Sequence, residues 1–174
     1  MQPYDILSIH LDDGTRLTVR PLTAGDRPLL QTAFDAFSSR SRYHRFFTPL
    51  SQLPSGHLDQ LTDLDAVDRF AWAAIAADGD PERLVAVARY FRLDDPGTAE
   101  IAVAVIDEFQ DRGLGTVMLW ALAQRASEMG IRRFEGLVLG ENLRMLRLLR
   151  KAGAHLQRDG AGTLAFTVDL PMAS

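Results

Sequence analysis

Residues 99–129 decide the fold, and they read AEIAVAVIDEFQDRGLGTVMLWALAQRASEM. The apolar run at 101–106 predicts a strand, and the acidic residues at 107–109 predict a turn. Apolar residues then recur at helical spacing and predict a helix that stops at Gly130, namely Leu114, Val117, Met118, Ala121 and Leu122. Because this helix begins almost at Gly113 and Gly115, its unpaired N–H groups lie beside residues without a Cβ. The stretch therefore predicts an anion site between a strand and a helix.

The pattern Gln110-x-x-Gly113-x-Gly115 resembles the acyl-CoA pyrophosphate loop of the GNAT N-acetyltransferase superfamily. A dinucleotide-binding loop is one alternative, but its fingerprint has a third glycine where this chain has Met118, and it opens a parallel βαβ unit. A tight strand-to-helix turn without any ligand is the other alternative. The order of elements along the rest of the chain favours acyl-CoA.

Length and composition indicate one globular domain over residues 1–174. The chain is 47% hydrophobic and 24% charged, close to the globular average, and it is long enough for a proper core. A net charge of −4 argues against a dedicated nucleic-acid partner, and the absence of cysteine excludes disulfides and thiolate metal sites. We find neither a signal peptide nor an apolar run of membrane-spanning length. We therefore expect a cytoplasmic protein with no nucleic-acid or membrane partner.

The N-terminal part predicts a hairpin followed by helices. Residues 6–10 and 16–20 flank Asp12-Asp13-Gly14, a turn whose glycine can adopt a positive φ. Apolar residues at helical spacing predict helices at 29–37 and 53–64.

Residues 39–47 mix arginines with aromatic residues. We interpret them as a short helix that buries Tyr43 and Phe46 or Phe47, in preference to a single-stranded nucleic-acid site. In that interpretation three arginines remain in solvent: Arg40, Arg42 and Arg45. The stretch also resembles the opening of the acetyltransferase domain in bacterial protein lysine acetyltransferases of the Pat type. The resemblance implies that this segment forms one wall of the acceptor site.

The central part predicts an antiparallel meander. Strands at 70–77, 84–91 and 99–106 are joined by turns at 78–81 and 94–97, which are rich in Asp, Pro and Gly.

The C-terminal part returns to the same sheet. A strand at 134–139 follows a helical crossover and is expected to lie parallel to the 101–106 strand. Asn142 caps a helix that runs to Lys151, and strands follow at 154–157 and 163–168. We therefore expect an α/β (α+β) domain with a mixed, mostly antiparallel sheet of about seven strands and helices on both faces. This order is similar to the GNAT fold along nearly the whole chain.

The resemblance implies acetyl-CoA as the cosubstrate and no metal. In this family the pantetheine arm pairs with the strand before the loop, because that strand splays from the parallel strand beyond the helix. The implied cofactor-binding residues are Val103, Ala104, Val105, Gln110, Asp111, Arg112, Gly113, Leu114, Gly115, Thr116 and Asn142. A basic stripe at Arg144, Arg147 and Lys151 is explained by a solvated helix face, with contact to the 3′-phosphate as the alternative.

Glu100 is the predicted general base. A lysine amine with a pKa near 10.4 is neutral in only about one molecule in 2,500 at pH 7, so a proton acceptor is useful. By two-residue alternation Glu100 shares a face with Ala102 and Ala104, which leave room for a substrate, and we expect its carboxylate to be partly desolvated. The family's protein acetyltransferases keep a catalytic glutamate at this spacing before Gln110. Glu108, in the turn, is the competitor.

Other candidates for proton transfer are weaker. Where the family commonly has a tyrosine general acid this chain has Leu149, although a thiol of pKa about 8.5 is already a good leaving group. Of the four histidines only His44 lies in a segment that borders the acceptor site. We expect direct acetyl transfer to a primary amine, which the resemblance identifies as a protein lysine. A small-molecule amine, an acyl-CoA-binding regulatory module without turnover, and a nucleic-acid module are the alternatives, and a homodimer is left open.

Overall fold

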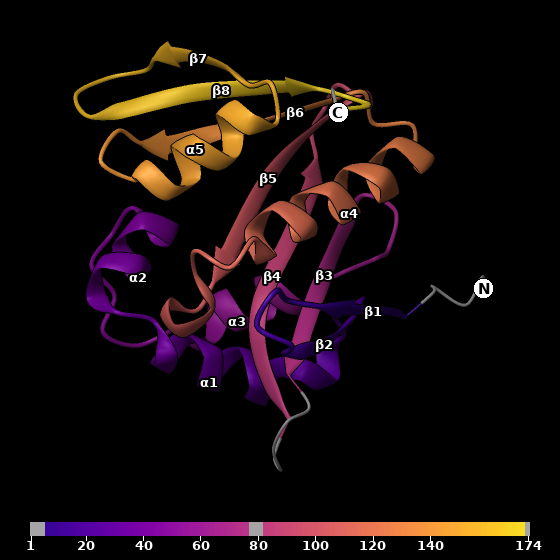
Figure 1. The fold of residues 1–174 in the computed structure, drawn as a ribbon. Coiled ribbons are helices and arrows are strands. Elements are labelled where there is room, and N and C mark those ends of the chain that lie inside the picture. The colour runs from indigo at the N-terminus through magenta and orange to yellow at the C-terminus, as the bar shows by residue number, and fades with distance from the viewer. Residues whose placement is uncertain (1–5, 77–81, 173–174) are drawn as a thin grey trace.

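A computed structural model describes residues 6–76 and 82–172, so the predicted turn at 78–81 lies outside the described residues (Figure 1). Within this part of the chain eight strands form one sheet in the order β1-β2-β3-β4-β5-β6-β8-β7, one more than the seven we expected. The strands are β1 (Leu7–His10), β2 (Arg16–Pro21), β3 (Arg69–Ala76), β4 (Arg83–Arg92), β5 (Thr98–Val105), β6 (Arg133–Leu139), β7 (His155–Arg158) and β8 (Thr163–Asp169).

In the described ranges five α-helices and two 3-10 turns join these strands, and the predicted order of elements is confirmed. The helices are α1 (Arg27–Ala36), α2 (Ser39–Phe46), α3 (Ser55–Thr62), α4 (Leu114–Glu128) and α5 (Leu143–Lys151). The short turns are η1 (Ala24–Asp26) and η2 (Asp107–Phe109). No helix in the two described ranges combines the length and the apolar composition needed to cross a bilayer.

The sheet forks between β5 and β6. These strands form the single parallel pair among the described strands, and their register covers only Thr98–Glu100 against Arg133–Glu135. Beyond Glu100 the two strands separate, while β5 stays paired with β4 as far as Val105 (Figure 1). One edge of residues 101–105 is therefore free of strand pairing, which is the splay that the resemblance implied.

Helices cover both faces of the sheet, as predicted. The Trp72 indole donates a hydrogen bond of 3.2 Å to the Ala121 carbonyl, which places α4 on one face. Arg89 follows Ala88, the strand partner of Trp72, so its side chain points to the other face of the sheet. There it donates to the Leu61 carbonyl of α3 at 3.4 Å. Because Arg89 is the Cα partner of Ala102, the side chains of Ala102 and Glu100 also point to the α3 face.

The buried stripe of α4 differs from the predicted one. Leu114, Met118 and Leu122 are buried as expected, but Val117 is 39% exposed and Leu119 is buried in its place. These three residues fit two possible apolar faces of the helix. The face that is buried continues through Leu119 and Ala126.

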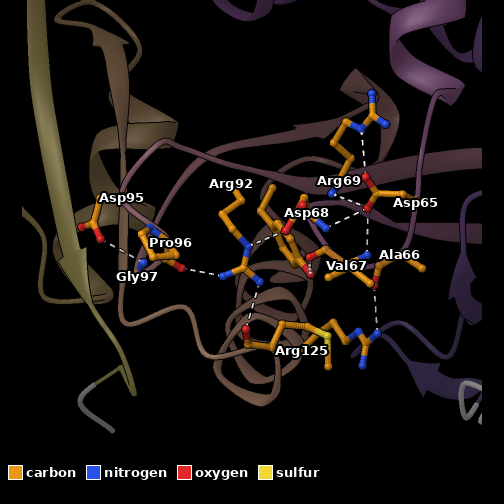
Figure 2. A network of polar contacts seen from close by, with 12 residues as sticks. Asp65, Ala66, Val67, Asp68, Arg69, Arg92, Asp95, Pro96, Gly97 and Arg125 are labelled. Carbon is orange, nitrogen blue, oxygen red and sulfur yellow. Dashed lines mark hydrogen bonds and ion pairs between the residues drawn. The ribbon is translucent and has the colours of Figure 1, made fainter.

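A polar network fixes the loop between α3 and β3 (Figure 2). Although burial acts to raise it, hydrogen bonds from the backbone N–H groups of Arg69, Val67 and Asp68 lower the pKa of Asp65 to about 2. Arg92 joins this loop to the end of α4, donating to Asp68 at 2.7 Å and to the Met129 carbonyl at 2.9 Å (Figure 2). The network ties the start of β3 to the C-terminal end of α4.

Candidate functional site

A cleft of about 760 Å³ opens where β5 and β6 separate. Its walls come from α2, β5, the loop before α4, the first turn of α4, α5 and the β6–β8 pair. The cleft brings together ten predicted site residues, namely Glu100, Val103, Ala104, Val105, Gln110, Asp111, Gly113, Gly115, Thr116 and Asn142.

The first turn of α4 faces this cleft with unpaired donors. Gly113 caps the helix in the left-handed region, at φ 80°, and its carbonyl accepts from the Thr116 N–H at 3.0 Å. Within the described residues the N–H groups of Gly113, Leu114 and Gly115 have no acceptor. This arrangement can bind a phosphate, because N–H groups and the positive end of the helix dipole meet at the cleft.

The loop residues before Gly113 hold the loop in place. The Gln110 amide donates to the Val105 carbonyl at 2.9 Å and to Ser41 Oγ at 3.3 Å, which closes the loop against β5 and α2. Asp111 adopts φ 60°, and its carboxylate accepts from Arg144 at 2.8 Å and from Arg147 at 3.2 Å. These two guanidinium groups lower the pKa of Asp111. The basic stripe of α5 is thus exposed but partly neutralised, and not simply a solvated face.

Two predicted cofactor residues lie outside the cleft. The Arg112 guanidinium pairs with Asp13 at 2.9 Å and stacks on the Phe109 ring, so it turns toward the β1–β2 hairpin. Leu114 is 1% exposed because its side chain packs into the core under α4. Both side chains therefore turn away from the cleft, and only the backbone of these two residues remains near it.

Asn142 and Leu149 occupy the positions that the sequence indicated. The Asn142 side chain caps α5 by accepting from the Met145 N–H at 3.2 Å, and it also lines the cleft. Leu149 is fully buried in the core. None of the described residues that line the cleft is a tyrosine, and the Tyr90 hydroxyl donates to the Val67 carbonyl away from it.

Helix α2 is anchored to the cofactor side of the cleft. Asp107 accepts hydrogen bonds from the Ser38 N–H at 3.0 Å, from Ser38 Oγ at 2.8 Å and from Ser41 Oγ at 3.0 Å. Burial opposes ionisation, but these hydrogen bonds keep the pKa of Asp107 below its ordinary value. Farther along the helix, His44 Nε2 lies 3.1 Å from Glu141 Oε1 in the loop before α5. His44 is therefore engaged in a structural contact across the cleft.

The arginines of α2 are not all in solvent, which corrects the sequence interpretation. Arg40 is exposed, but Arg42 stacks on Phe34 and donates to the carbonyls of Phe34, Asp35 and Ser51. Arg45 points inward and lines both the cleft and a smaller inner cavity of about 60 Å³. The predicted aromatic burial is only partial, since Tyr43 and Phe46 are half-buried and Phe47 is 39% exposed.

Glu100 stands at the fork, on the face that two-residue alternation predicted. It lines the cleft but is exposed, so the expected desolvation is wrong, because β6 leaves the sheet immediately beyond it. Its competitor Glu108 pairs with Arg83 at 2.7 Å and does not line the cleft. The sequence interpretation missed Glu135, the Cα partner of Glu100, which is half-buried and lines the same cleft.

The cleft crosses the sheet at the fork. Val103 and Val105 alternate with Ala102 and Ala104, so they face α4 and the unpaired donors, whereas Glu100 faces α2 and α3. The cleft therefore gives access to the free edge of β5 both from the α4 side and from the Glu100 side.

Comparison with known proteins gives concordant results. The sequence model of one family, described as an acetyltransferase (GNAT) domain, matches residues 16–155. The chain is 30% identical over 166 residues to Acetyltransferase Pat of Mycolicibacterium smegmatis, covering 95% of this chain and 49% of that protein. It is 30% identical over 149 residues to Acetyltransferase PA5475 of Pseudomonas aeruginosa, covering 86% of this chain and 80% of that protein.

A solved structure shares the fold of this chain. The GNAT domain of S. lividans PAT has a TM-score of 0.86 at 32% identity, covering 95% of this chain and 97% of that one. The chain spans about half the length of its Mycolicibacterium relative.

Proposed function

This chain belongs to the GNAT acetyltransferase family, and from that premise we propose that it transfers an acetyl group from acetyl-CoA to a primary amine. The observation that carries the proposal is the convergence of three features in one cleft. They are the unpaired N–H groups of the α4 first turn, the free edge of β5, and the carboxylate of Glu100.

The cofactor side fits acetyl-CoA in charge and in shape. The N–H groups of residues 113–115 suit a pyrophosphate, and the unpaired edge of residues 101–105 offers backbone donors and acceptors to the pantetheine amides. A Cβ on Gly115 would lie 3.6 Å from Leu148 and 3.9 Å from Val105, two residues that line the cleft. Glycine therefore keeps this part of the cleft open for the arm.

Direct transfer is the proposed mechanism. Acetyl-CoA supplies a thioester whose carbonyl carbon bonds to the amine nitrogen while its C–S bond breaks. Glu100 accepts the proton that the amine must lose, and the departing thiolate takes a proton from water, since no described tyrosine reaches the cleft. The thiol is a sufficient leaving group without a dedicated acid, because its pKa is about 8.5.

A protein lysine is the proposed acceptor. The resemblance to Pat-type protein lysine acetyltransferases motivates this choice, and the rim of the cleft supports it. Phe47 and Leu137 line the cleft and are 39% and 50% exposed, so the rim offers apolar contacts to a polypeptide, while Glu100 and Glu135 attract a cation. A free small amine would use the carboxylates but not the apolar rim.

Two measurements test the proposal. Calorimetric titration with acetyl-CoA should show loss of binding in Gly115→Glu and no change in the control Gly56→Glu, whose Cβ meets open space in α3. Thiol release from acetyl-CoA should then be followed with lysine-containing proteins and with small amines. Binding without release for any acceptor would make the chain a non-catalytic module. Equal affinity of wild type and Gly115→Glu would reject the cofactor site.

A further inference from the structure

Phe166 lies at the apex of the fork, on the α4 side of the sheet. It is the Cα partner of Gly136 in the β6–β8 pair, and Gly136 directly follows Glu135, the last residue of β6 that pairs with β5. Because Glu135 faces the acceptor side, Gly136 and Phe166 face α4. The Phe166 ring is only 2% exposed, yet it lines the cleft, so it forms part of the cleft floor.

Gly136 allows this ring to reach across the fork. A Cβ at residue 136 would lie 2.8 Å from Cζ and 3.0 Å from Cε1 of Phe166, and 3.6 Å from the Ile101 carbonyl oxygen of β5. The tip of the ring therefore lies against the backbone of β6, beside the first residue of β5 that no longer pairs with β6. Glycine weakens the interior of a strand, and the backbone of Gly136 has no positive φ that would require it. The close approach of the ring is what excludes a larger residue.

An acyl-CoA bound as proposed would place its reacting end at this apex. The unpaired N–H groups of residues 113–115 hold the phosphates near Val105, since a Cβ on Gly115 would lie 3.9 Å from the Val105 side chain. From Val105 the free edge of β5 runs back to Ile101, a span of about 13 Å at the rise of a strand. A pantetheine arm that follows this edge would end where β6 closes the gap, beside Phe166.

The two faces of the apex restrict the direction of an acyl chain. The acceptor amine and Glu100 occupy one face, so carbon atoms beyond the thioester carbonyl have to extend toward the α4 face. There the ring of Phe166 fills the space between β6 and the Ile101 carbonyl, and Gly136 has no side chain that could move to make room. A closely packed interior does not accept additional methylene groups without strain.

We propose that Phe166 determines the acyl-chain specificity of this enzyme, because its ring leaves room for the methyl group of acetyl-CoA and excludes the longer chain of butyryl-CoA. The proposal rests on the proposed function, since it takes acetyl-CoA as the cosubstrate and the free edge of β5 as the site of its pantetheine arm. It adds that the apex of the fork selects the acyl group, through a contact that takes no part in the proton transfer at Glu100.

The test compares kcat/KM for acetyl-CoA, propionyl-CoA and butyryl-CoA in a thiol-release assay, with one lysine peptide as the common acceptor. Wild type should prefer acetyl-CoA over butyryl-CoA by roughly 100-fold or more, since a single methylene in a fitted pocket changes kcat/KM by roughly 10- to 200-fold. Phe166→Leu removes the Cε and Cζ atoms that lie at the apex. It should shift the ratio toward butyryl-CoA by roughly 10-fold or more, with propionyl-CoA between the two.

Phe134→Leu is the matched control. Phe134 is a fully buried residue of β6 on the same face as Gly136, but it does not line the cleft. Both substitutions remove the same atoms from the core, so both should lower the unfolding temperature, whereas only Phe166→Leu should change the acyl-chain preference.

The double variant Phe166→Leu/Gly136→Ala refills the apex without an aromatic ring. The alanine methyl group would occupy the space that the ring tip leaves, so the ratio should return toward that of wild type. Gly136→Ala alone should unfold at a lower temperature than wild type, because its Cβ would meet the buried ring at 2.8 Å.

Equal kcat/KM of wild type for acetyl-CoA and butyryl-CoA would overturn the proposal, and this measurement needs no variant. An unchanged ratio in folded Phe166→Leu, or an equal change in Phe134→Leu, would overturn it as well. Each of these results leaves the proposed function intact, because acetyl-CoA is still bound and turned over. Calorimetric titration of wild type with acetyl-CoA is the separate check, since absence of binding would reject the proposed cofactor site and, with it, this role of Phe166.

Discussion

Glu100 and Glu135 are Cα partners at the last register position of the parallel pair β5–β6, immediately before the two strands separate. Side chains of partner residues point to the same face, so both carboxylates face the acceptor side of the cleft. Within the described residues neither carboxylate has an ion pair or accepts a hydrogen bond. Two like charges at a strand end are unfavourable for the sheet, and the ammonium group of the proposed acceptor would relieve their repulsion on entering the cleft.

Glu135→Gln tests the contribution of the second carboxylate. We expect the acceptor KM to rise roughly 2- to 10-fold, more at low ionic strength, because the substitution removes attraction for a cationic amine. The change in kcat should be small, whereas Glu100→Gln should lower kcat by roughly 10²–10⁴ at neutral pH. Steady-state kinetics with a lysine peptide give both constants. Asp159→Asn, which changes an exposed carboxylate that does not line the cleft, is the control. A loss of kcat as large as that of Glu100→Gln would show that the two carboxylates share the role of base.

Asp111→Asn tests the loop that precedes α4. In the structure the Asp111 carboxylate forms ion pairs with Arg144 and Arg147, both of which line the cleft. Removal of its charge frees two guanidinium groups for the phosphates of acetyl-CoA, and asparagine tolerates the left-handed φ of 60°. We expect acetyl-CoA to bind roughly 2- to 10-fold more tightly at low salt, with a steeper salt dependence, in calorimetric titrations. Weaker binding at every salt concentration would show that the contact with α5 is needed to order the loop.

The parts of the site that could be predicted from the sequence are local. Gly113 and Gly115 lie directly between a strand and a helix, and the alternation of Glu100 with Ala102 and Ala104 needs only the strand period. The cap at Asn142 also depends on a neighbour three residues away. In each case the partner groups are close in sequence, so periodicity and capping rules are sufficient to place them.

The missed residues depend on contacts across the chain. Asp107 meets Ser38 across 69 residues and His44 meets Glu141 across 97, while Glu135 joins Glu100 only through the register of a parallel pair. The sequence does not show that Arg45 points inward, because the pattern of an eight-residue helix is too short to define an inner face. The register of strands and the rotation of a short helix are set by tertiary packing, which local patterns do not determine.

Asp26→Asn tests a pH-dependent contribution to stability outside the site. Hydrogen bonds from Arg20 at 2.7 and 2.9 Å, and then from Thr23, hold the pKa of this buried carboxyl below its ordinary value of 3.8. A depressed pKa in the folded state stabilises the fold at pH values above 3.8 and loses that effect as the pH falls through the lower folded value. We expect Asn to cost about 1–3 kcal/mol at pH 7 in urea unfolding, with a smaller difference at pH 3. An equal difference at both pH values would contradict the assignment.

Gly115→Ala should weaken acetyl-CoA binding without lowering the stability of the fold. Gly115 lies in the first turn of α4 with ordinary helical backbone, and a Cβ would make only van der Waals contact with Leu148 and Val105. We expect stability to stay equal or to rise by about 0.5–1 kcal/mol, because alanine favours the helix over glycine. Acetyl-CoA affinity should fall, since the methyl group enters the cleft. Thermal unfolding and calorimetry on the same preparation measure both effects, and unchanged affinity would place the pantetheine arm elsewhere.

Gly113→Ala should instead lower stability, because the backbone of Gly113 has a positive φ. Its φ of 80° lies in the left-handed region, while a Cβ there would meet nothing within 4 Å. The substitution is therefore strained by backbone conformation and not by contact, and we expect a loss of about 1–2 kcal/mol in unfolding free energy. Gly113→Asn, which tolerates a positive φ, should recover part of this loss. If acetyl-CoA binds Gly113→Asn as well as wild type, the donors of the α4 first turn act through their N–H groups and need no bare Cα at residue 113. Loss of binding in a stable Gly113→Asn would instead show that the phosphate approaches the backbone at this residue, closer than a Cβ allows.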